Sequence, residues 1–410
     1  MPGALAPRRP WQGRRVVLGV TGGIAAYKSA QLARDLTELG AAVDVVLTRA
    51  AREFVGAITF EALTGRPVIG DILDPGNALG HIRLAREADV VCVAPATADF
   101  LARAAAGRAD DMLTAILLAT TAPVLLCPAM NDRMWAHPQT RANVRHLRRR
   151  LGYRIVGPAV GRLAYGEGAG PGRMEEPATI VEHVGRALSG ETPFTGRTVI
   201  VTAGPTREPV DPVRFLSNRS SGRMGYAIAA AAWRRGAHVI LITGPSALDA
   251  PTGAEVVRVE TAEQMAGAVR AALPRADVLI MAAAVADFRP AGPAERKIKR
   301  KEAPEAIALE PAPDVLGVTR AARPAGLVTV GFALETHDAL ANARAKLESK
   351  ALDLIVLNDA TVPGAGFEVE TNRVVILDRD GAEEALPLMS KHDVAEALLD
   401  RVSALLGPRQ

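Results

Sequence analysis

The stretch from Thr202 to Gly225, TAGPTREPVDPVRFLSNRSSGRMG, contains the residue types of a binding site rather than of a core. Its last residues, with Ser220 or Ser221 as a candidate N-cap, stand where a helix should begin. The exposed N–H groups and the dipole of a helix N-terminus favour an anion such as phosphate. Positive charge comes from Arg207, Arg214, Arg219 and Arg223. We therefore expect this stretch to bind a phosphate-bearing ligand.

The main alternative is an ordinary dinucleotide-binding turn. The apolar run Arg197 to Ala203 precedes the stretch and the helix-forming run Met224 to Arg235 follows it, which gives the order strand, glycine turn, helix. The GxGxxG spacing is absent, however. The next strand, His238 to Thr243, also ends without the acidic residue that would hold a ribose. A phosphate site of another kind is favoured.

The first half of the chain alternates apolar strands with helical patterns. Residues Arg15 to Thr48 predict a strand, a glycine turn, a helix and a second strand, which together form a βαβ unit. Further strands are expected at Asp89 to Ala94 and at Pro123 to Cys127, followed by the polar segments APATADF and PAMNDRMW. Ligands of open α/β sheets bind beyond the carboxyl ends of the strands. These segments should therefore border a site.

A glycine-rich segment from Gly161 to Met174, GRLAYGEGAGPGRM, closes the first half. It has few apolar anchors, so we predict a mobile loop that could act as a lid over the sheet edge. A plain surface loop is the alternative. A helix over Pro177 to Leu188 follows, and Ser189 to Gly196 is typical of a linker. The predicted domains are residues 1–190 and 191–410.

The second half again alternates strands and helices, with further strands at Asp277 to Ala282 and Asp353 to Leu357. Near its end, Thr371 to Leu386 contains an Asp-Gly pair between two apolar runs, which predicts a hairpin. The predicted fold class is therefore α/β, with two Rossmann-like domains built on parallel sheets.

Composition narrows the class of protein. The 410 residues are 49% hydrophobic and 23% charged, as in a globular protein, and carry a net charge of +4. Only 4% are aromatic, and the basic runs His146 to Arg150 and Arg296 to Lys301 lack interleaved aromatics, so nucleic acid is not expected as a partner. No apolar run approaches the ~20 residues of a membrane span. Cys92 and Cys127 lie in apolar runs, which favours reduced, buried thiols in a cytoplasmic protein.

Motifs along nearly the whole chain resemble those of one enzyme family, the bifunctional phosphopantothenoylcysteine decarboxylase/phosphopantothenate–cysteine ligases of bacterial coenzyme A biosynthesis. In the first half they are GVTGGIAAYK from Gly19, HIRLA from His81, PATAD from Pro95 and PAMNDRMW from Pro128. In the second half they are the stretch Thr202 to Gly225, AAVADFR from Ala283, KIK from Lys297, PDVL from Pro313, GFALE from Gly331 and the pair Lys346 and Lys350.

For the second half the resemblance implies a ligase that activates the carboxylate of 4′-phosphopantothenate with CTP and Mg²⁺. An acyl-cytidylate forms, and the amine of cysteine then displaces CMP. Lys297, Lys346 and Lys350 would face the CTP phosphates, and Arg214 and Asn218 would handle the acyl-cytidylate. The remaining nucleotide-pocket positions are Ala283, Asp287, Pro313, Asp314, Val315, Leu316 and Phe332. Residue type alone would instead make Phe332 a core residue and the lysine pair a solvated helix face.

For the first half the resemblance implies a flavodoxin-like cysteine decarboxylase that uses FMN to convert phosphopantothenoylcysteine to 4′-phosphopantetheine. In the family, bound FMN oxidises the cysteinyl side, carbon dioxide leaves, and the reduced flavin returns the hydride. His81 matches the catalytic histidine and Asn131 the contact to the substrate carboxylate. The implied FMN-binding residues are Gly22, Gly23, Thr48, Pro95, Ala96 and Thr97. The resemblance also implies homo-oligomers, with trimeric flavin halves and dimeric ligase halves.

The lid departs from the family pattern. Most members carry a cysteine there as proton donor, whereas this chain has Tyr165 in a lid that is one residue longer. A tyrosine, with a pKa near ~10, is a weaker acid than a thiol near ~8.5, so proton delivery should be slower. Tyr165, another group or water could serve, or the reaction could stop at the enethiol. The alternative function is a working ligase fused to a flavin-binding regulatory or scaffold half.

Overall fold

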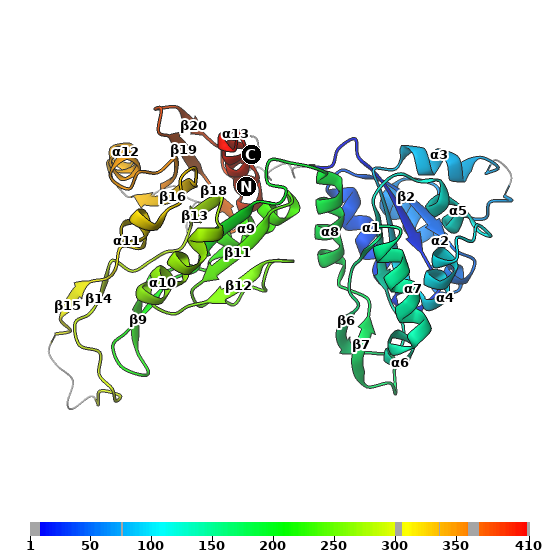
Figure 1. Cartoon of the computed structure of the whole chain (residues 1–410), viewed down its shortest axis with the longest axis horizontal. Helices are drawn as coiled ribbons and strands as arrows, with labels where there is room; N and C mark the ends of the chain where they lie inside the picture. Colours follow the sequence, from blue (N-terminus) through cyan, green and yellow to red (C-terminus); the bar gives the residue numbers. More distant parts are fainter. Residues whose placement is uncertain (1–8, 75–76, 300–305, 336, 360–368, 408–410) are drawn as a thin grey trace. The chain divides into compact units, whose positions relative to one another are not determined.

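The computed structural model describes residues 9–74, 77–299, 306–335, 337–359 and 369–407. Contacts within the chain divide it into two compact units, Met1–Ser189 (unit 1) and Gly190–Gln410 (unit 2). Each unit has a central sheet with helices, as Figure 1 shows. The expected α/β class with parallel sheets is confirmed. The last two residues of the basic run Arg296 to Lys301 lie outside the described residues.

Unit 1 is built on a five-stranded parallel sheet with the strand order β2-β1-β3-β4-β5. This is the flavodoxin-like order. The strands are β1 (Arg15–Val20), β2 (Ala42–Leu47), β3 (Val90–Ala96), β4 (Val124–Pro128) and β5 (Arg154–Ile155). All residues of β3 and β4 are buried. Such continuous apolar runs are typical of parallel strands that are covered on both faces.

Helices cover both faces of the unit 1 sheet. Val16 and Leu18 of β1 belong to one apolar cluster, and Val17 belongs to the cluster on the other face. The first face carries α1 (Lys28–Glu38), α2 (Ala57–Thr64) and α8 (Pro177–Ser189). The second face carries α3 (Gly80–Glu87), α4 (Ala98–Ala105), α5 (Met112–Ala119) and α7 (Pro138–Arg149). Side chains of a strand alternate between faces, so one strand supplies both cores.

The glycine-rich segment that was predicted as a loop is a two-stranded hairpin. Its antiparallel strands are β6 (Ala159–Arg162) and β7 (Ala169–Arg173). Gly166 and Gly168 have positive φ values of 83° and 77°, which a turn between short strands requires. The prediction failed because two short strands without apolar alternation carry no strand signal in the sequence.

Unit 2 contains an eight-stranded sheet in the order β12-β11-β8-β13-β16-β17-β19-β20. Its strands are β8 (Thr198–Ala203), β11 (His238–Thr243), β12 (Glu255–Arg258), β13 (Val278–Met281), β16 (Val328–Glu335), β17 (Leu354–Asp359), β19 (Val374–Asp378) and β20 (Glu383–Ala385). The first six are parallel and follow the Rossmann order. The last two are antiparallel and form the predicted hairpin, in which Gly381 has a φ of 91°.

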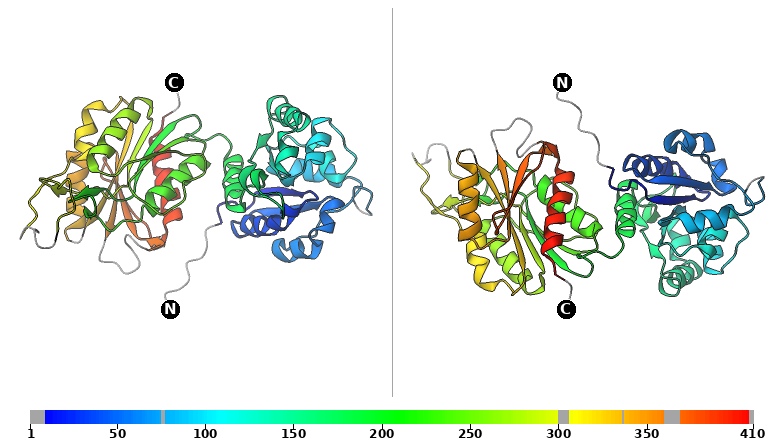
Figure 2. Two further views of the ribbon diagram at one scale, coloured as in Figure 1. Left: turned by 90° about the horizontal axis from the view of Figure 1, so that it is seen from below. Right: turned by 90° about the horizontal axis from the view of Figure 1, so that it is seen from above.

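Helices cover both faces of this sheet as well, as Figure 2 shows. One face carries α9 (Arg223–Arg234) and α13 (Lys391–Leu405). The other carries α10 (Ala262–Ala272), α11 (Val315–Thr319) and α12 (Ala339–Ser349). Three two-stranded ribbons complete the unit: β9 (Arg207–Pro209) with β10 (Phe215–Ser217), β14 (Phe288–Pro290) with β15 (Leu309–Pro311), and β18 (Thr371–Asn372) with β21 (Met389–Ser390). The stretch Thr202 to Gly225 thus contains a hairpin that was not predicted.

The N-cap of α9 is Gly222, with a φ of 83°, and neither predicted serine caps this helix. A Cβ at position 222 would lie 3.2 Å from the Gly204 nitrogen, so the chain needs glycine where the helix entry approaches the end of β8. The Ser220 hydroxyl instead accepts the N–H of Gly222 at 3.3 Å. The close approach of the α9 N-terminus to Gly204 therefore determines the N-cap residue, and no local sequence pattern indicates this approach.

Two further expectations concern the cysteines and membranes. Cys92 and Cys127 are free and fully buried, as predicted. Within the parts of the chain that the structure describes, no helix combines the length and the apolar character needed to cross a bilayer.

Two helical glycines provide a test of unit 2 packing. A Cβ at Gly225 would lie 2.6 Å from the Ala203 Cβ and 2.9 Å from the Thr202 oxygen, whereas a Cβ at Gly267 in α10 meets nothing within 4 Å. We expect Gly225→Ala to destabilise unit 2 by about 1–3 kcal/mol through overpacking. Gly267→Ala should stabilise it by about 0.5–1 kcal/mol. Hydrogen exchange read by mass spectrometry would follow unit 2 peptides in the full chain. Equal effects of both changes would contradict the packing of α9 on β8.

Candidate functional site

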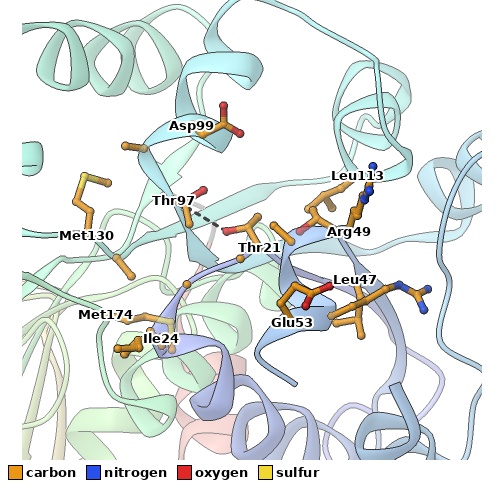
Figure 3. A pocket seen from close by; sticks show the side chains of 18 of the residues that line it. Thr21, Ile24, Leu47, Arg49, Glu53, Thr97, Asp99, Leu113, Met130 and Met174 are labelled. Atoms are coloured by element: carbon orange, nitrogen blue, oxygen red, sulfur yellow. Dashed lines mark hydrogen bonds between the residues drawn. The ribbon is translucent and has the colours of Figure 1, made fainter. Parts of the chain in front are cut away.

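Unit 1 holds a cavity of about 1340 Å³ at the carboxyl ends of its strands. Its walls come from the turns after β1, β2, β3 and β4 and from the β6–β7 hairpin. Figure 3 shows part of this wall. Ligand pockets of proteins are typically about 300–1,000 Å³. The cavity is therefore large enough for a cofactor together with a substrate.

Hydrogen bonds join the turns after β1 and β3. The Thr21 hydroxyl donates to the Pro95 carbonyl at 2.7 Å and accepts the N–H of Thr97 at 3.1 Å (Figure 3). Gly22 is required beside them, because a Cβ there would lie 2.4 Å from the Ala50 Cβ in the short helix η2 (Ala50–Glu53). These contacts hold the two strand ends in a fixed relation.

The predicted FMN residues fall into two groups. Gly22, Gly23, Thr48 and Thr97 line the cavity. Pro95 and Ala96 are buried in β3 and are not part of the lining, although the Pro95 carbonyl accepts the hydrogen bond that orients the Thr21 hydroxyl.

The wall combines apolar and charged side chains. Leu47, Leu113, Met130 and Met174 supply apolar surface, and Arg49 lies beside Leu47 and Leu113 (Figure 3). On one side Arg103 forms ion pairs with Asp99, Asp110 and Asp111 at 3.1, 3.2 and 2.7 Å. An apolar slot beside open backbone turns suits a flat aromatic ring that carries a phosphate tail.

The predicted catalytic residues of unit 1 are not all brought together. Asn131 lines the cavity as the N-cap of α6 (Asp132–Ala136), and its Oδ1 accepts the N–H of Arg133 at 2.9 Å. His81 lies on α3 and does not line this cavity; its Nδ1 is buried without a hydrogen-bond partner among the described residues. Tyr165 is fully exposed at the tip of the hairpin and is also absent from the wall.

Two residues on or near the wall were missed. Glu167 of the hairpin turn lines the cavity, two residues after Tyr165. Glu176 binds Lys28 at 2.9 Å and Arg173 at 2.5 Å, and both of these cations line the cavity. The Lys28 hydrogen bond lowers the pKa of Glu176, against the smaller opposing effect of burial. Glu176 thus ties the lid hairpin to α1. Its role depends on a pairing across 148 residues, which the sequence does not signal.

Several predicted nucleotide residues of unit 2 lie near the carboxyl ends of β8, β13 and β16. The Asn218 amide donates to the carbonyls of Ala284 and Val285 at 3.2 and 2.9 Å. It therefore lies against the segment between Ala283 and Asp287. The N–H of Ala286 donates to the Thr206 hydroxyl at 3.0 Å, so the two loops are joined at several points.

The lysine pair reaches the same region from α12. The Lys346 ammonium donates to the Phe332 carbonyl at 2.9 Å, and the Lys350 ammonium pairs with the Asp314 carboxylate. Burial lowers the pKa of Lys346, and the carboxylates of Glu335, Asp287 and Asp314 offset only part of that shift. The interpretation of Lys346 as part of a solvated face is wrong, because its side chain is partly buried against the strand end.

Other members of the predicted nucleotide set are structural or exposed. Val315 and Leu316 are buried in α11, next to Pro313, and Phe332 is partly buried against the core. Lys297 is exposed on a segment without helix or strand. Arg214 approaches that segment, because its guanidinium donates to the Ile298 carbonyl and pairs with Asp211 at 3.1 Å.

Comparisons with known proteins identify the family. A family model described as Flavoprotein matches residues 5–189, and one described as DNA/pantothenate metabolism flavoprotein C-terminal domain matches residues 194–406. The coenzyme A biosynthesis bifunctional protein CoaBC of Mycobacterium tuberculosis H37Rv is 50% identical over 409 residues, covering 96% of this chain and 97% of the relative. This chain belongs to the CoaBC family. It is a bifunctional enzyme of coenzyme A biosynthesis, with decarboxylase and ligase activities.

A second relative agrees. CoaBC of Vibrio vulnificus YJ016 is 44% identical over 399 residues, or 96% of this chain and 98% of the relative. A crystal structure of the C-terminal domain of CoaBC is 38% identical, covers 53% of this chain and 98% of that chain, and has a TM-score of 0.46. A PPC decarboxylase mutant complexed with pantothenoylaminoethenethiol is 32% identical, covers 42% and 96%, and has a TM-score of 0.38. Nothing supports the alternative of a merely regulatory flavin half.

The unit 1 cavity fits the flavin that its family model implies. Its apolar side chains can sandwich a ring, and the backbone of the turn at Gly22 and Gly23 is open to a phosphate because neither residue carries a side chain. Gly22 also lets η2 approach, which shapes the wall.

Flavin binding should therefore depend on Gly22. In Gly22→Ala the new Cβ would displace η2, and we expect the flavin dissociation constant to rise roughly tenfold or more, since a 1.4 kcal/mol loss suffices. Gly56→Ala is the matched control, because Gly56 lies outside the cavity lining and its Cβ would meet only the Ile58 side chain at 3.9 Å. Flavin absorbance per chain and fluorescence titration measure both variants. Full flavin retention in Gly22→Ala would refute this assignment.

Proposed function

We propose that residues 1–190 form an FMN-dependent phosphopantothenoylcysteine decarboxylase and residues 191–410 a CTP-dependent phosphopantothenate–cysteine ligase. The observation that carries this division is that the two family models fall on separate units. The candidate sites also lie at the carboxyl ends of parallel strands in two separate sheets. A cytoplasmic location and the absence of a nucleic-acid partner remain predictions.

In the proposed ligase reaction, a carboxylate oxygen of 4′-phosphopantothenate attacks the α-phosphorus of CTP and pyrophosphate leaves. The cysteine amine then attacks the acyl carbon and CMP leaves. Phosphate charge requires cations, so we assign Lys297, Lys346 and Lys350 to the triphosphate, together with Mg²⁺. Within the described residues, no group of three or more His, Cys, Asp or Glu side chains is placed to hold a metal ion.

We assign Arg214 and Asn218 to the acyl-cytidylate. A guanidinium donates hydrogen bonds to carbonyl and phosphate oxygens, and the Asn218 amide would do so by releasing the Ala284 or Val285 carbonyl to which it donates without substrate. The nucleotide would lie along Ala283, Asp287, Phe332 and the turn Pro313 to Leu316. The contact of Asn218 with Ala284 and that of Lys346 with Phe332 support this placement, since each joins two of the assigned segments.

In the decarboxylase half, Gly22, Gly23, Thr48 and Thr97 would hold FMN, which would supply reversible hydride transfer for the substrate. The Asn131 amide nitrogen would hold the substrate carboxylate at the wall. His81 lies off the wall of its own chain. We therefore propose that it acts in the trimeric flavin half, where a neighbouring copy could complete the site. A dimeric ligase half is proposed from the same family resemblance.

The final step needs a proton. Decarboxylation replaces the carboxylate with hydrogen, so an acid must deliver a proton to the substrate when the hydride returns. Tyr165 occupies the position of the family's lid cysteine but is fully exposed. Glu167 lines the cavity on the same turn, and we therefore propose its carboxyl as the acid, with Tyr165 as the second candidate.

Mass spectrometry of the products from phosphopantothenoylcysteine tests the decarboxylase assignment and the acid together. We expect the flavin-loaded protein to release carbon dioxide and form 4′-phosphopantetheine. Glu167→Gln should accumulate the enethiol, which has two fewer hydrogens, whereas Tyr165→Phe should retain the complete reaction. The opposite pattern would assign the acid to Tyr165. An unchanged substrate would remove the decarboxylase assignment itself.

The ligase should lose activity at alkaline pH as Lys346 deprotonates. Because burial lowers its pKa, Lys346 loses its charge at a lower pH than an exposed lysine does. Lys346→Arg keeps the charge, so we expect the alkaline limb of kcat/KM for CTP to move to higher pH. Lys350→Arg, on the same helix face, should leave that limb in place. If Lys346→Arg left it unmoved, another group would control it.

A further inference from the structure

Asp211 is a buried carboxylate in the turn between β9 and β10, and it is not one of the residues proposed to contact the ligase substrates. Its Oδ1 accepts the N–H groups of Val213 and Arg214 at 2.8 and 2.9 Å. Its Oδ2 accepts the N–H of Ile298 at 3.2 Å and lies 3.1 Å from the Arg214 guanidinium. The side chain has no exposed surface. Every donor comes from the chain segments that carry Arg214 and Lys297.

These contacts join two segments that are 87 residues apart in sequence. The bonds from the N–H groups of Val213 and Arg214 close the turn on which the Arg214 side chain is carried. The bond from the Ile298 N–H fixes the backbone next to Lys297. The Arg214 guanidinium also donates a hydrogen bond to the Ile298 carbonyl. One more link comes from the Ala294 N–H, which donates to the Val210 carbonyl at 2.9 Å. The segment before and after Lys297 is therefore fastened to the hairpin, while the Lys297 side chain stays exposed.

A carboxylate is chemically suited to this position. Burying an unpaired charge is costly, but here both oxygens are supplied with donors. Burial raises the pKa of Asp211, and the three backbone N–H groups and the charge of Arg214 outweigh that effect and lower it overall. The group therefore remains an anion at neutral pH. An amide could not replace it, because one end of the amide is itself a donor and would face a backbone N–H.

The geometry points to Asp211 as a positioning residue of the ligase, which sets Arg214 and Lys297 at a fixed separation so that both cations face one phosphate-bearing substrate. This inference rests on the proposed roles of Arg214 and Lys297. Lys297 lies on a segment without helix or strand, so ordering it only when the substrate binds would cost conformational entropy. A preorganised pair of cations avoids that cost at the moment of reaction.

The test uses Asp211→Asn in the full-length, flavin-loaded protein, with 4′-phosphopantothenate, cysteine and CTP as substrates. We expect ligase kcat/KM to fall about 10- to 100-fold, as for a catalytic group displaced by about 1 Å. Decarboxylation of phosphopantothenoylcysteine should not change, because Asp211 lies in the other unit. Hydrogen exchange should rise in peptides that span Ala294 to Ile298 but not in α9. Wild-type ligase kinetics would overturn the inference.

A double-mutant cycle separates positioning from a general loss of stability. If Asp211 acts through Arg214 and Lys297, adding Asp211→Asn to the double variant Arg214→Ala, Lys297→Ala should cost less than about threefold, because both groups that it positions are already gone. Losses that multiply would overturn the inference and leave the proposed role of Lys297 intact. Wild-type kinetics in Lys297→Ala alone would instead refute that proposed role, and the inference with it.

A second variant covers the case in which Asp211→Asn fails to fold. Ile298→Pro removes the N–H that Ile298 donates to Asp211, and its ring also fixes the φ of residue 298 and restricts the backbone of Lys297. We expect the same loss of ligase kcat/KM and the same loss of coupling to Lys297. An unchanged ligase in Ile298→Pro would overturn the inference.

Discussion

The parallel pairing of β8 with β13 brings together loops that are far apart in sequence. Thr202 pairs with Met281, so both strands end at the same edge of the sheet. Beyond that edge, Ala284 donates its N–H to the Gly204 carbonyl at 2.9 Å, and Asn218 reaches the carbonyls of Ala284 and Val285. β1 and β3 repeat this arrangement in unit 1, where Thr21 and Thr97 meet. In both units the strand order reverses at this pair of strands, which is where open α/β sheets bind ligands.

The charges near these strand ends are already paired within the protein. Lys350 pairs with Asp314, Arg223 with Glu370, Arg214 with Asp211, and Lys28 with Glu176. Where such a pair is exposed, as for Arg223 and Glu370, it adds little to stability, but it holds a long side chain near the position where an anionic substrate needs it. A substrate phosphate would compete with the exposed carboxylates, whereas the buried Asp211 would keep its contacts with Arg214.

Glycine acts in both units where backbone must approach backbone. Gly22 lets η2 lie against the first turn, Gly222 lets α9 approach the end of β8, and Gly172 lets the lid strand lie on the loop that carries Asn131. In that last contact Met130 donates its N–H to the Gly172 carbonyl at 2.9 Å, and a Cβ at Gly172 would lie 2.2 Å from the Met130 oxygen. The β6–β7 hairpin is thus attached to the site wall at β7 and through Glu176, while its tip carries Tyr165 and Glu167.

Local periodicity and turn chemistry were enough to predict the α/β class, the strands around Val16 and Val199, the α8 helix and the Asp-Gly hairpin, because each pattern is written in consecutive residues. The motifs also led to the wall residues Gly22, Thr97 and Asn131. The β6–β7 and β9–β10 hairpins, the Gly222 cap, and the positions of Asp211, Glu167 and Glu176 were decided only by the tertiary structure. Each depends on turn geometry or on partners that are up to 148 residues away in the sequence. The sequence does not distinguish a buried carboxylate from an exposed one, because only the folded chain brings the hydrogen-bond donors to it.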